Sequence, residues 1–589
     1  MENLDRGLVA VRTDESTVML SWRYLMSDPM DQTFTIYRDG KKIGQTTAQQ
    51  STTFTDQNKA SEKTVYEVRP SKGKWNGTWT LQAEMPIGYL DIPLDKPADD
   101  QSAGWNGGYS AGDASVADLD GDGQMEIVLK WEPNNCKDNS HSGFTSPVLF
   151  DAYKLDGTKL WRINLGRNIR AGAHYTQFMV YDLDGDGKAE VVMKTGDGTT
   201  DAKGKVIGNP SADWRKQPVT GSRDERVGYI YDGPEYLTVF NGLTGEAIQT
   251  IDYQPARGRL EDWGDNYANR SERYLACVAY LDGIHPSVVM CRGYYTRTTL
   301  WALDFDGKKL KTRWFFDSDK AGRDYYGQGN HNLRVGDVDG DGKDEIVYGA
   351  CAFDDDGTGL YSTRMGHGDA MHMTGFFPND DRLYVWDCHE NKRDGAELHD
   401  AATGQIISQF KSGADVGRCM AADIDPTNPG LEMWSLANGV ANVKGEVLAD
   451  RPRGLSTNMA VWWDGDLLRE LLDHESITKY DWEKKSCNVL LRMDGCQFNN
   501  SSKSNPCLQG DIIGDWREEV LVRTRDSQHL RLYISTLDTD YRFHTFLQDP
   551  VYRISIATQN VAYNQPTQPG FYFGADLKKS GRVFRGWKF

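Results

Sequence analysis

Three acidic loops with the pattern Asp-x-Asp-Gly-Asp-Gly-x-x-Glu are the part of the sequence best suited to metal chemistry. They begin at Asp118, Asp182 and Asp337, and each runs into a short apolar stretch. In such a loop the first, third and fifth carboxylates turn inward, the glycines allow the tight backbone angles, and the last Glu closes the shell. Hard oxygen ligands favour calcium, so we predict several Ca²⁺ ions. The predicted ligands are Asp118, Asp120, Asp122, Glu126, Asp182, Asp184, Asp186, Glu190, Asp337, Asp339, Asp341, Glu345 and, in a weaker copy, Asp423, Asp425 and Glu432.

A single string of this kind is often an ordinary turn in which Asp side chains bond nearby backbone amides. Three intact copies at matching places argue against that interpretation here. Most of these sites are expected to stabilise the fold at a distance from any substrate.

Other polar residues lie in loops rich in Gly or Asn that do not fit a stabilising role. Each of them alone is more often a surface or packing residue than a functional one. Together they supply hydrogen-bond donors, cations and ionisable groups that a reaction on a sugar needs. These residues are Asn135, His331, His367, Arg418, Asn500, Lys503, Tyr563 and Asn564.

The sequence pattern predicts β-strands throughout the segments that carry these residues. Residues 6–83 alternate apolar and polar positions around turns such as Asp39-Gly40, which predicts a small β-sandwich. The remaining chain repeats an acidic loop, a strand and a hairpin about eight times, which favours a ring of blades. We therefore predict an all-β protein, with a sandwich at 1–90 and an eight-bladed β-propeller at 91–589. Only a stretch such as 466–472 has the spacing of a helical turn.

Composition limits the possible partners. The chain of 589 residues has 86 acidic and 67 basic side chains, a formal charge of -19, which argues against nucleic acid or an anionic membrane as a partner. Its apolar runs are too short for a membrane helix. No signal peptide is visible; we nevertheless expect a monomer that is secreted, periplasmic or at the cell surface. Most of the nine cysteines should be buried, and Cys496 and Cys507 are the pair to test for a disulfide.

The sequence resembles polysaccharide lyase family 11, the rhamnogalacturonan lyases. The resemblance runs from Leu4-Asp5-Arg6-Gly7-Leu8-Val9-Ala10-Val11, through the acidic loops, to Gly510-Asp511-Ile512-Ile513-Gly514-Asp515-Trp516-Arg517-Glu518-Glu519. It implies a fibronectin type III-like β-sandwich, then an eight-bladed propeller with many calcium ions and a cleft over its centre. It also implies that Asn135, His331, His367, Arg418, Asn500, Lys503 and Tyr563 line this cleft. We expect catalytic roles for Lys503, Tyr563 and Arg418, and substrate binding by Asn135, Asn500, His331, His367 and Asn564.

The implied reaction is β-elimination in rhamnogalacturonan I, the pectin backbone that alternates rhamnose with galacturonic acid. A base removes the weakly acidic C5 proton of the uronate, and the C4 oxygen leaves, so the product is a 4,5-unsaturated galacturonate. Calcium and a cation such as Arg418 would neutralise the carboxylate. We expect an endolyase with Lys503 as base and Tyr563 as acid or as the alternative base. The histidines suit substrate binding, metal binding or the role of the base.

Three other functions remain open on the sequence alone. An exo-acting lyase would differ by a single loop over the cleft. A calcium-dependent propeller that only binds carbohydrate would share the acidic loops. A glycoside hydrolase would need two carboxylates that flank the bond, and the many Asp and Glu residues leave that possibility open.

Overall fold

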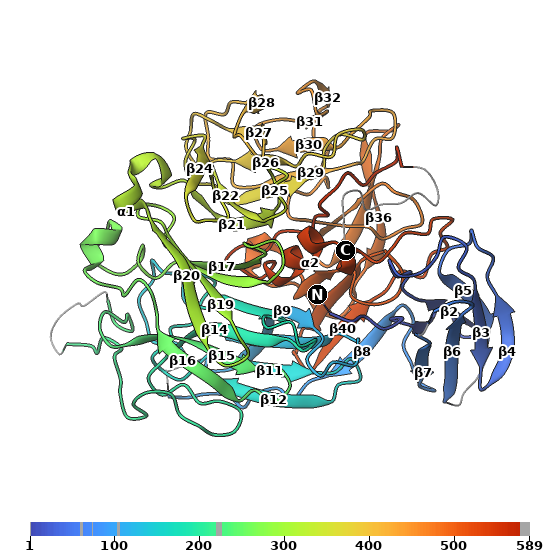
Figure 1. Cartoon of the computed structure of the whole chain (residues 1–589), viewed down its shortest axis with the longest axis horizontal. Coiled ribbons are helices and arrows are strands. Elements are labelled where there is room, and N and C mark those ends of the chain that lie inside the picture. Colours follow the sequence, from blue (N-terminus) through green and yellow to red (C-terminus); the bar gives the residue numbers. More distant parts are fainter. Residues whose placement is uncertain (1, 59–62, 74, 103–105, 220–225, 578–589) are drawn as a thin grey trace.

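The computed structural model describes residues 2–58, 63–73, 75–102, 106–219 and 226–577, and the chain is all-β. Two sheets form the N-terminal part, drawn in blue to one side of the larger body in Figure 1. The first has the order β1-β2-β5, with bounds Val9–Arg12, Thr17–Ser21 and Thr53–Gln57. The second has the order β4-β3-β6-β7, with bounds Lys41–Gln45, Phe34–Arg38, Thr64–Pro70 and Gly77–Leu81.

Eight further sheets follow in the described chain, and seven of them are four consecutive antiparallel strands. The first four comprise β9 to β24: Tyr109–Ala117, Glu126–Pro133, Leu149–Tyr153, Lys159–Asn164; Phe178–Tyr181, Glu190–Gly196, Glu235–Asn241, Ala247–Asp252; Tyr274–Ala279, Ser287–Arg292, Thr299–Phe305, Leu310–Asp317; Gly329–Gly336, Glu345–Gly349, Cys351–Phe353 and Gly359–Ser362. The next three comprise β25 to β36: Ala370–Thr374, Tyr384–Cys388, Ala396–Asp400, Ile406–Phe410; Cys419–Ala422, Glu432–Ser435, Val440–Ala441, Val447–Ala449; Met459–Val461, Glu470–Asp473, Ser476–Asp481 and Ser486–Arg492.

The last sheet joins the two ends of this region. Its path is β37-β39-β40-β8, and β38 also pairs with β39. Because β8 precedes the first of the eight sheets in the chain, its pairing with β40 ties the beginning of the region to its end. The predicted boundary at residue 90 falls within β8. The bounds of β8 and β37 to β40 are Tyr89–Pro93, Cys496–Gln497, Leu508–Gly510, Glu519–Thr524 and His529–Tyr533.

The first strands of successive sheets lie next to one another around a central helix. Contacts link β9 to β13, β13 to β17, β17 to β21, β21 to β25 and β25 to β29. Helix α2 (Pro550–Ala557) contacts β9, β13, β17, β21 and β38. In Figure 1 the colours pass around α2 from blue-green through green and yellow to orange. Asp549 caps this helix and Pro550 occupies its first turn, so eight apolar-rich residues form it in an otherwise β-rich chain.

Short helical segments lie between the strands: η1 (Leu260–Trp263), α1 (Ser318–Ala321), η2 (Arg323–Tyr325), η3 (Ser501–Lys503) and η4 (Phe546–Gln548). The predicted helical turn at 466–472 is wrong, because β34 begins at Glu470 and the preceding residues form a loop. The leucines at 467, 468, 471 and 472 are buried between sheets instead. Their spacing therefore reflects burial on both sides of a short strand, which mimics a helical pattern.

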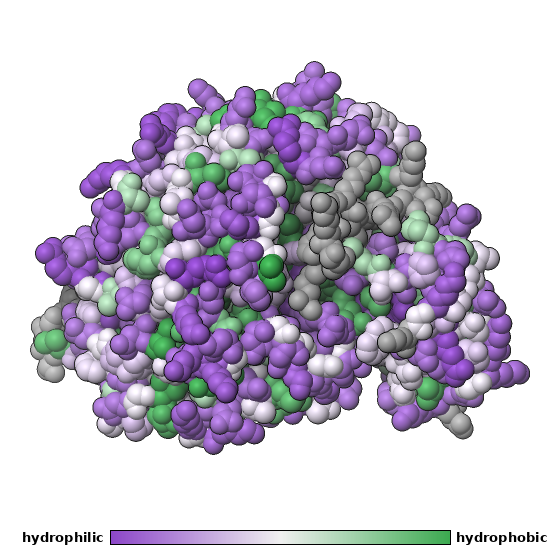
Figure 2. Space-filling view, in the orientation of Figure 1, coloured by the Kyte–Doolittle hydropathy of each residue, from purple (hydrophilic) through white to green (hydrophobic). Residues whose placement is uncertain are grey.

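The core is formed by the sheets packing face to face. Strands such as β14 and β17 are buried along their whole length, as expected where both faces of a sheet are covered. All nine cysteines are free, including Cys496 and Cys507, and seven of them are buried. Hydrophilic residues cover most of the face seen in Figure 2, with apolar residues in small groups between them. Among the residues that the structure describes, no helix is long and apolar enough to span a membrane.

Candidate active site

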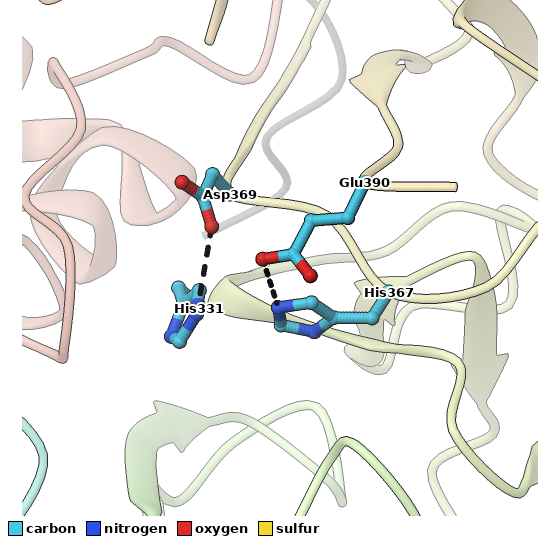
Figure 3. A group of neighbouring side chains, drawn as sticks. All are labelled: His331, His367, Asp369 and Glu390. Carbon is cyan, nitrogen blue, oxygen red and sulfur yellow. Dashed lines mark ion pairs between the residues drawn. The ribbon is translucent and has the colours of Figure 1, made fainter. Parts of the chain in front are cut away.

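Four side chains from three neighbouring segments converge on one point, as Figure 3 shows. His331 lies on β21, His367 and Asp369 lie just before β25, and Glu390 lies just after β26. One ligand atom from each side chain falls within 4.8 Å of all the others. Nε2 of His331 is 3.4 Å from Oδ1 of Asp369, and Nε2 of His367 is 3.5 Å from Oε1 of Glu390. We call these four residues the ligand group.

The ligand group has the composition of a divalent-cation site. Nε2 of His367 and Oδ1 of Asp369 are buried and have no hydrogen-bond partner. A buried polar atom without a partner costs free energy, and a cation bound to both atoms would remove that cost. Burial lowers the pKa of His331 well below its usual range, so its ring is neutral and can act as a ligand. The four residues therefore fit such an ion.

Two tyrosines fix the ring of His331. Tyr294 places its hydroxyl 2.9 Å from Nδ1, and Tyr295 places its hydroxyl 3.0 Å from Nε2. Nδ1 of His367 lies 2.5 Å from the backbone oxygen of Gly329, at the start of β21. Both rings are thus oriented by groups outside the ligand group, which is common around metal-binding histidines.

Lys503 and Tyr563 lie directly beside the ligand group. Nζ of Lys503 is 2.7 Å from Oδ2 of Asp369 and 4.2 Å from the centre of the Tyr563 ring. The Tyr563 ring centre is 4.1 Å from that of His331, and its backbone N–H donates to the His331 carbonyl oxygen. Burial raises the pKa of Tyr563, which keeps its hydroxyl protonated. The structure therefore brings together four of the residues singled out in the sequence: His331, His367, Lys503 and Tyr563.

The loop that carries Lys503 is closed at its base and strained at its tip. Asn499 and Asn505 exchange two backbone hydrogen bonds, of 2.6 and 3.2 Å. Asn500 and Ser504, on either side of Lys503, both have positive φ angles, of 61° and 46°. Non-glycine residues in this conformation cost free energy and persist where the surroundings hold them. The loop thus presents Lys503 toward Asp369.

Arg418 lies immediately before β29 and is buried. Its Nη2 donates to the backbone oxygens of Asn458 and Asn564, at 3.0 and 3.3 Å. Nε and Nη1 are buried without a hydrogen-bond partner. Burial lowers the pKa of Arg418, an effect that the Asp369 carboxylate opposes. Arg418 is thus a cation near the ligand group with unsatisfied donors.

The three predicted asparagines differ in their surroundings. Asn135 exchanges two hydrogen bonds with Ser146, through both atoms of its side-chain amide. Asn564 is fully buried, and its side chain donates to Asp113 at 3.1 Å. Asn500 is exposed at the tip of the Lys503 loop. Of the three, Asn500 is the exposed residue, and its side-chain amide donates to Oδ1 of Asn505 at 3.3 Å.

The acidic loops occupy the same position in several sheets. The loops at 118–125, 182–189 and 337–344 each connect the first strand of a sheet to the second. In each loop the first Asp accepts backbone N–H groups from both glycines, and the closing Glu accepts the N–H of the second loop residue. Three carboxylates lie within 4.8 Å in each: Asp118, Asp120 and Asp122; Asp182, Asp184 and Glu190; Asp337, Asp339 and Glu345.

Electrostatics in these loops favours a bound cation. Burial, together with the neighbouring aspartates, raises the pKa of Glu126 to about 7 and the pKa values of Glu190 and Glu345 to about 8. Oε1 of Glu345 is buried without a hydrogen-bond partner. Lys154 partly offsets the charge of the first loop, with Nζ 2.5 Å from Oδ2 of Asp120. The carboxylates thus repel one another unless a cation lies between them.

The weaker copy has the same closing contact. Oε2 of Glu432 accepts the N–H groups of Ile424 and Asp425, both at 2.9 Å. Oδ1 of Asp423 and Oε1 of Glu432 are buried without partners, while Lys485 lies 3.2 Å from Asp425.

Sequence reasoning missed several residues of both kinds of site. Asp369 and Glu390 were not selected, although Asp369 stands two residues after His367; a short Gly-His-Gly-Asp string was the available signal. A further acidic loop was also missed, in which Nζ of Lys479 lies 2.6 Å from Asp466 and 3.0 Å from Glu470. Lys479 thus lies among these carboxylates as Lys154 does in the first acidic loop.

The acidic loops and the ligand group lie at opposite ends of the same strands. On β21, His331 is near the start, whereas the loop that begins at Asp337 follows the end. Asp369 and Arg418 directly precede β25 and β29, again at strand starts. The loops are therefore separated from the ligand group by the length of a strand, which supports the predicted stabilising role.

Comparison with known proteins defines the class of molecule that carries this fold and site. The family model "Rhamnogalacturonan lyase family 11, C-terminal domain" matches residues 89–583, and "Rhamnogalacturonan I lyases beta-sheet domain" matches residues 1–82. The chain is 52% identical to rhamnogalacturonan exolyase YesX of Bacillus subtilis, over 98% of this chain and 96% of that protein. It is 51% identical to rhamnogalacturonan endolyase YesW of the same organism, over 98% of this chain and 91% of that protein.

Solved structures agree with these matches. The crystal structure of YesW superposes with a TM-score of 0.92 at 49% identity, and covers 100% of this chain and 99% of that one. The structure of the Bacillus licheniformis rhamnogalacturonan lyase PL11 superposes with a TM-score of 0.92 at 51% identity, and 99% of both chains is covered. The chain therefore belongs to rhamnogalacturonan lyase family 11.

Proposed function

We propose that this protein is a rhamnogalacturonan endolyase that cleaves the rhamnose-α-1,4-galacturonic acid bond of rhamnogalacturonan I by β-elimination. The observation that carries the proposal is the convergence of Lys503, Tyr563 and Arg418 on the ligand group. An amine, a phenol and a guanidinium beside a cation site supply the base, the acid and the carboxylate-neutralising charge that elimination from a uronate requires.

In this mechanism Lys503, as the neutral amine, removes the proton at C5 and becomes the ammonium ion. Its Nζ is held between Asp369 and the Tyr563 ring, so it points into the site from a closed loop. Tyr563, which stays protonated because burial raises its pKa, donates a proton to the departing C4 oxygen. Arg418 faces the developing negative charge with donors that are otherwise unsatisfied.

We propose that His331, His367, Asp369 and Glu390 hold a divalent cation, with calcium in the acidic loops and here. When bound at the ligand group, the ion would neutralise the galacturonate carboxylate and so acidify the C5 proton. The four residues provide two nitrogen and two oxygen ligands within 4.8 Å of one another. Substrate oxygens would complete the oxygen-rich shell that calcium prefers.

Endo action is supported by cationic side chains on two sides of the site, where a chain could continue past the cleaved bond. An open depression of about 520 Å³ is lined by residues 451–458 and Asp473, next to the Asn458 carbonyl that binds Arg418. Arg451 and Arg453 are exposed on it. On the side of His367, the guanidinium of Arg270 stacks 4.0 Å above the Tyr295 ring, which is itself 4.0 Å from the His367 ring. These cations suit a polyanion that continues beyond the cleaved bond.

We further propose that the eight sheets are the blades of a closed β-propeller and that the N-terminal pair forms a fibronectin type III-like sandwich, with a boundary near residue 90. The pairing of β8 with β40 and the contacts between first strands support a closed ring. A secreted, periplasmic or cell-surface monomer that degrades pectin is the setting in which such an enzyme would meet its substrate.

Product analysis tests this function against its alternatives. Mass spectrometry of digested rhamnogalacturonan I should show products lighter by one water than hydrolysis products, released first as a broad range of sizes. Release of one short product from the start would indicate exo action. Products that contain the added water would indicate a hydrolase, and an unchanged polymer a binding protein.

A further inference from the structure

A second set of polar side chains, fully buried, lies behind the ligand group. It consists of Glu397 and His399 on β27, Asp387 on β26 and His389 directly after β26, all with 0% exposure. The Glu397 carboxylate bridges the two histidines. Its Oε2 lies 2.7 Å from Nε2 of His389, and its Oε1 lies 2.9 Å from Nδ1 of His399. None of these residues has a role in the reaction described above.

The hydrogen bonds determine the charge of His389. Its Nδ1 lies 2.9 Å from the backbone oxygen of Gly366, which can only accept, and its Nε2 faces the Glu397 carboxylate. Both ring nitrogens therefore carry hydrogen, and the ring is an imidazolium paired with Glu397. The Tyr361 hydroxyl can donate to Nε2 of His399 at 3.1 Å.

Hydrogen bonds within the protein engage nearly every polar atom of this set. Both oxygens of Glu397 and all four histidine nitrogens already have partners. Of Asp387, Oδ1 accepts from Asn330 at 2.6 Å, and Oδ2 lacks a partner. The set is thus an internal ion pair with its own hydrogen-bond network.

The network touches the chain next to three members of the ligand group. The carbonyl that His389 binds belongs to Gly366, which directly precedes His367. Glu390 directly follows His389, and its backbone N–H donates to the His367 carbonyl at 3.0 Å. Asn330, held by Asp387, directly precedes His331. One buried network therefore anchors the backbone on which His331, His367 and Glu390 are carried.

We propose that the buried His389–Glu397 ion pair is the positioning device of the ligand group, setting the distance between His367 and Glu390. It touches neither the cation nor the substrate, and acts through the Gly366 carbonyl and the backbone of Glu390. The inference rests on the proposed function, in which the ligand group holds a divalent cation. Residues that orient ligands in this way typically change metal affinity by about 10-fold to 100-fold when they are removed.

The test uses Co²⁺, whose visible spectrum depends on ligand type and geometry. The Co²⁺ spectra of the full-length protein and of its His367→Ala variant are compared. The absorbance that the variant lacks comes from Co²⁺ bound at the ligand group, and we call it the His367-dependent component. Glu397→Gln keeps the side-chain shape and removes the charge, and should weaken Co²⁺ binding in that component by about 10-fold to 100-fold. His399→Gln leaves the His389–Glu397 pair in place, and should weaken Co²⁺ binding less than Glu397→Gln does. Asp151→Asn is the matched control, because Asp151 is fully buried and ion-paired with Arg162 at 2.6 Å on an outer strand.

The control should lose thermal stability without any change in the His367-dependent component. Native Co²⁺ affinity in Glu397→Gln would overturn the inference, as would a native protein with no His367-dependent component. If that component behaves as expected while the native enzyme leaves rhamnogalacturonan I intact, the proposed function fails and the positioning role stands.

Discussion

Nζ of Lys503 lies 2.7 Å from Oδ2 of Asp369, although the two residues are 134 positions apart in the chain. Asp369 also belongs to the ligand group, so one carboxylate contacts both the proposed base and the proposed cation site. The orientation of the base and the occupancy of the cation site should therefore depend on each other. This coupling distinguishes a catalytic arrangement from a collection of surface charges.

Replacing Lys503 by Ala should lower kcat by about 100-fold to 10,000-fold, the usual contribution of a general base. The melting temperature should stay nearly unchanged, because the side chain is partly exposed. Lys159→Ala is a matched control: that lysine is 24% exposed, against 23% for Lys503, and pairs with Asp95 at the same 2.7 Å. The control should be fully active, whereas a fully active Lys503→Ala would remove Lys503 from the mechanism.

A double-mutant cycle should reveal the coupling between Lys503 and Asp369. Asp369→Asn alone should reduce kcat strongly, because it removes a ligand and the partner of the base. The double variant should be little worse than Lys503→Ala, since groups that act as a unit give non-additive losses. Steady-state kinetics of the four proteins measure this, and additive losses would show that the contact is incidental.

Arg270→Ala should raise KM for the polymer about 5-fold while kcat stays the same, as expected when an exposed ion pair of about 1 kcal/mol is lost from both ground and transition states. The effect should shrink with oligosaccharides that span only the cleaved bond. Arg259→Ala, whose side chain is 76% exposed in the same region, should leave KM unchanged. A fall in kcat with KM unchanged would place Arg270 in the chemical step instead.

Chelation should lower both the melting temperature and the activity, and added calcium should restore both. The free energy of unfolding falls because the native state loses ligands that the unfolded chain binds poorly. Differential scanning calorimetry and activity assays during a chelator titration separate the two effects. Activity lost before stability would mean that the ligand group binds its ion more weakly than the acidic loops. A protein indifferent to chelation would contradict both kinds of site.

Much of the site could be predicted because its residue types are scarce and its motifs local. Two loop histidines, Lys503 and Tyr563 stand out in a chain with only 11 histidines, and the structure brings these four together. Asp369 and Glu390 could not be chosen in the same way, because 86 acidic residues offer too many candidates. To identify them, one must know which strands begin next to one another, and only the three-dimensional arrangement of the sheets determines that.

The all-β class followed from alternation and turn residues, which act locally. The error at 466–472 arose because leucines at helix-like spacing also suit a short strand buried on both faces. The contact between Asn564 and Asp113 joins residues 451 positions apart, and sequence spacing does not reveal such a pairing.

The central claim is elimination by the base on the Lys503 loop, and ultraviolet absorbance during incubation with rhamnogalacturonan I and calcium tests it most directly. The account predicts that absorbance rises steadily with the native protein as the 4,5-unsaturated product forms. Absorbance should hardly rise with Lys503→Ala, provided that the variant is folded and binds as much metal as the native protein. No rise with the native protein, or an equal rise with the variant, would contradict it.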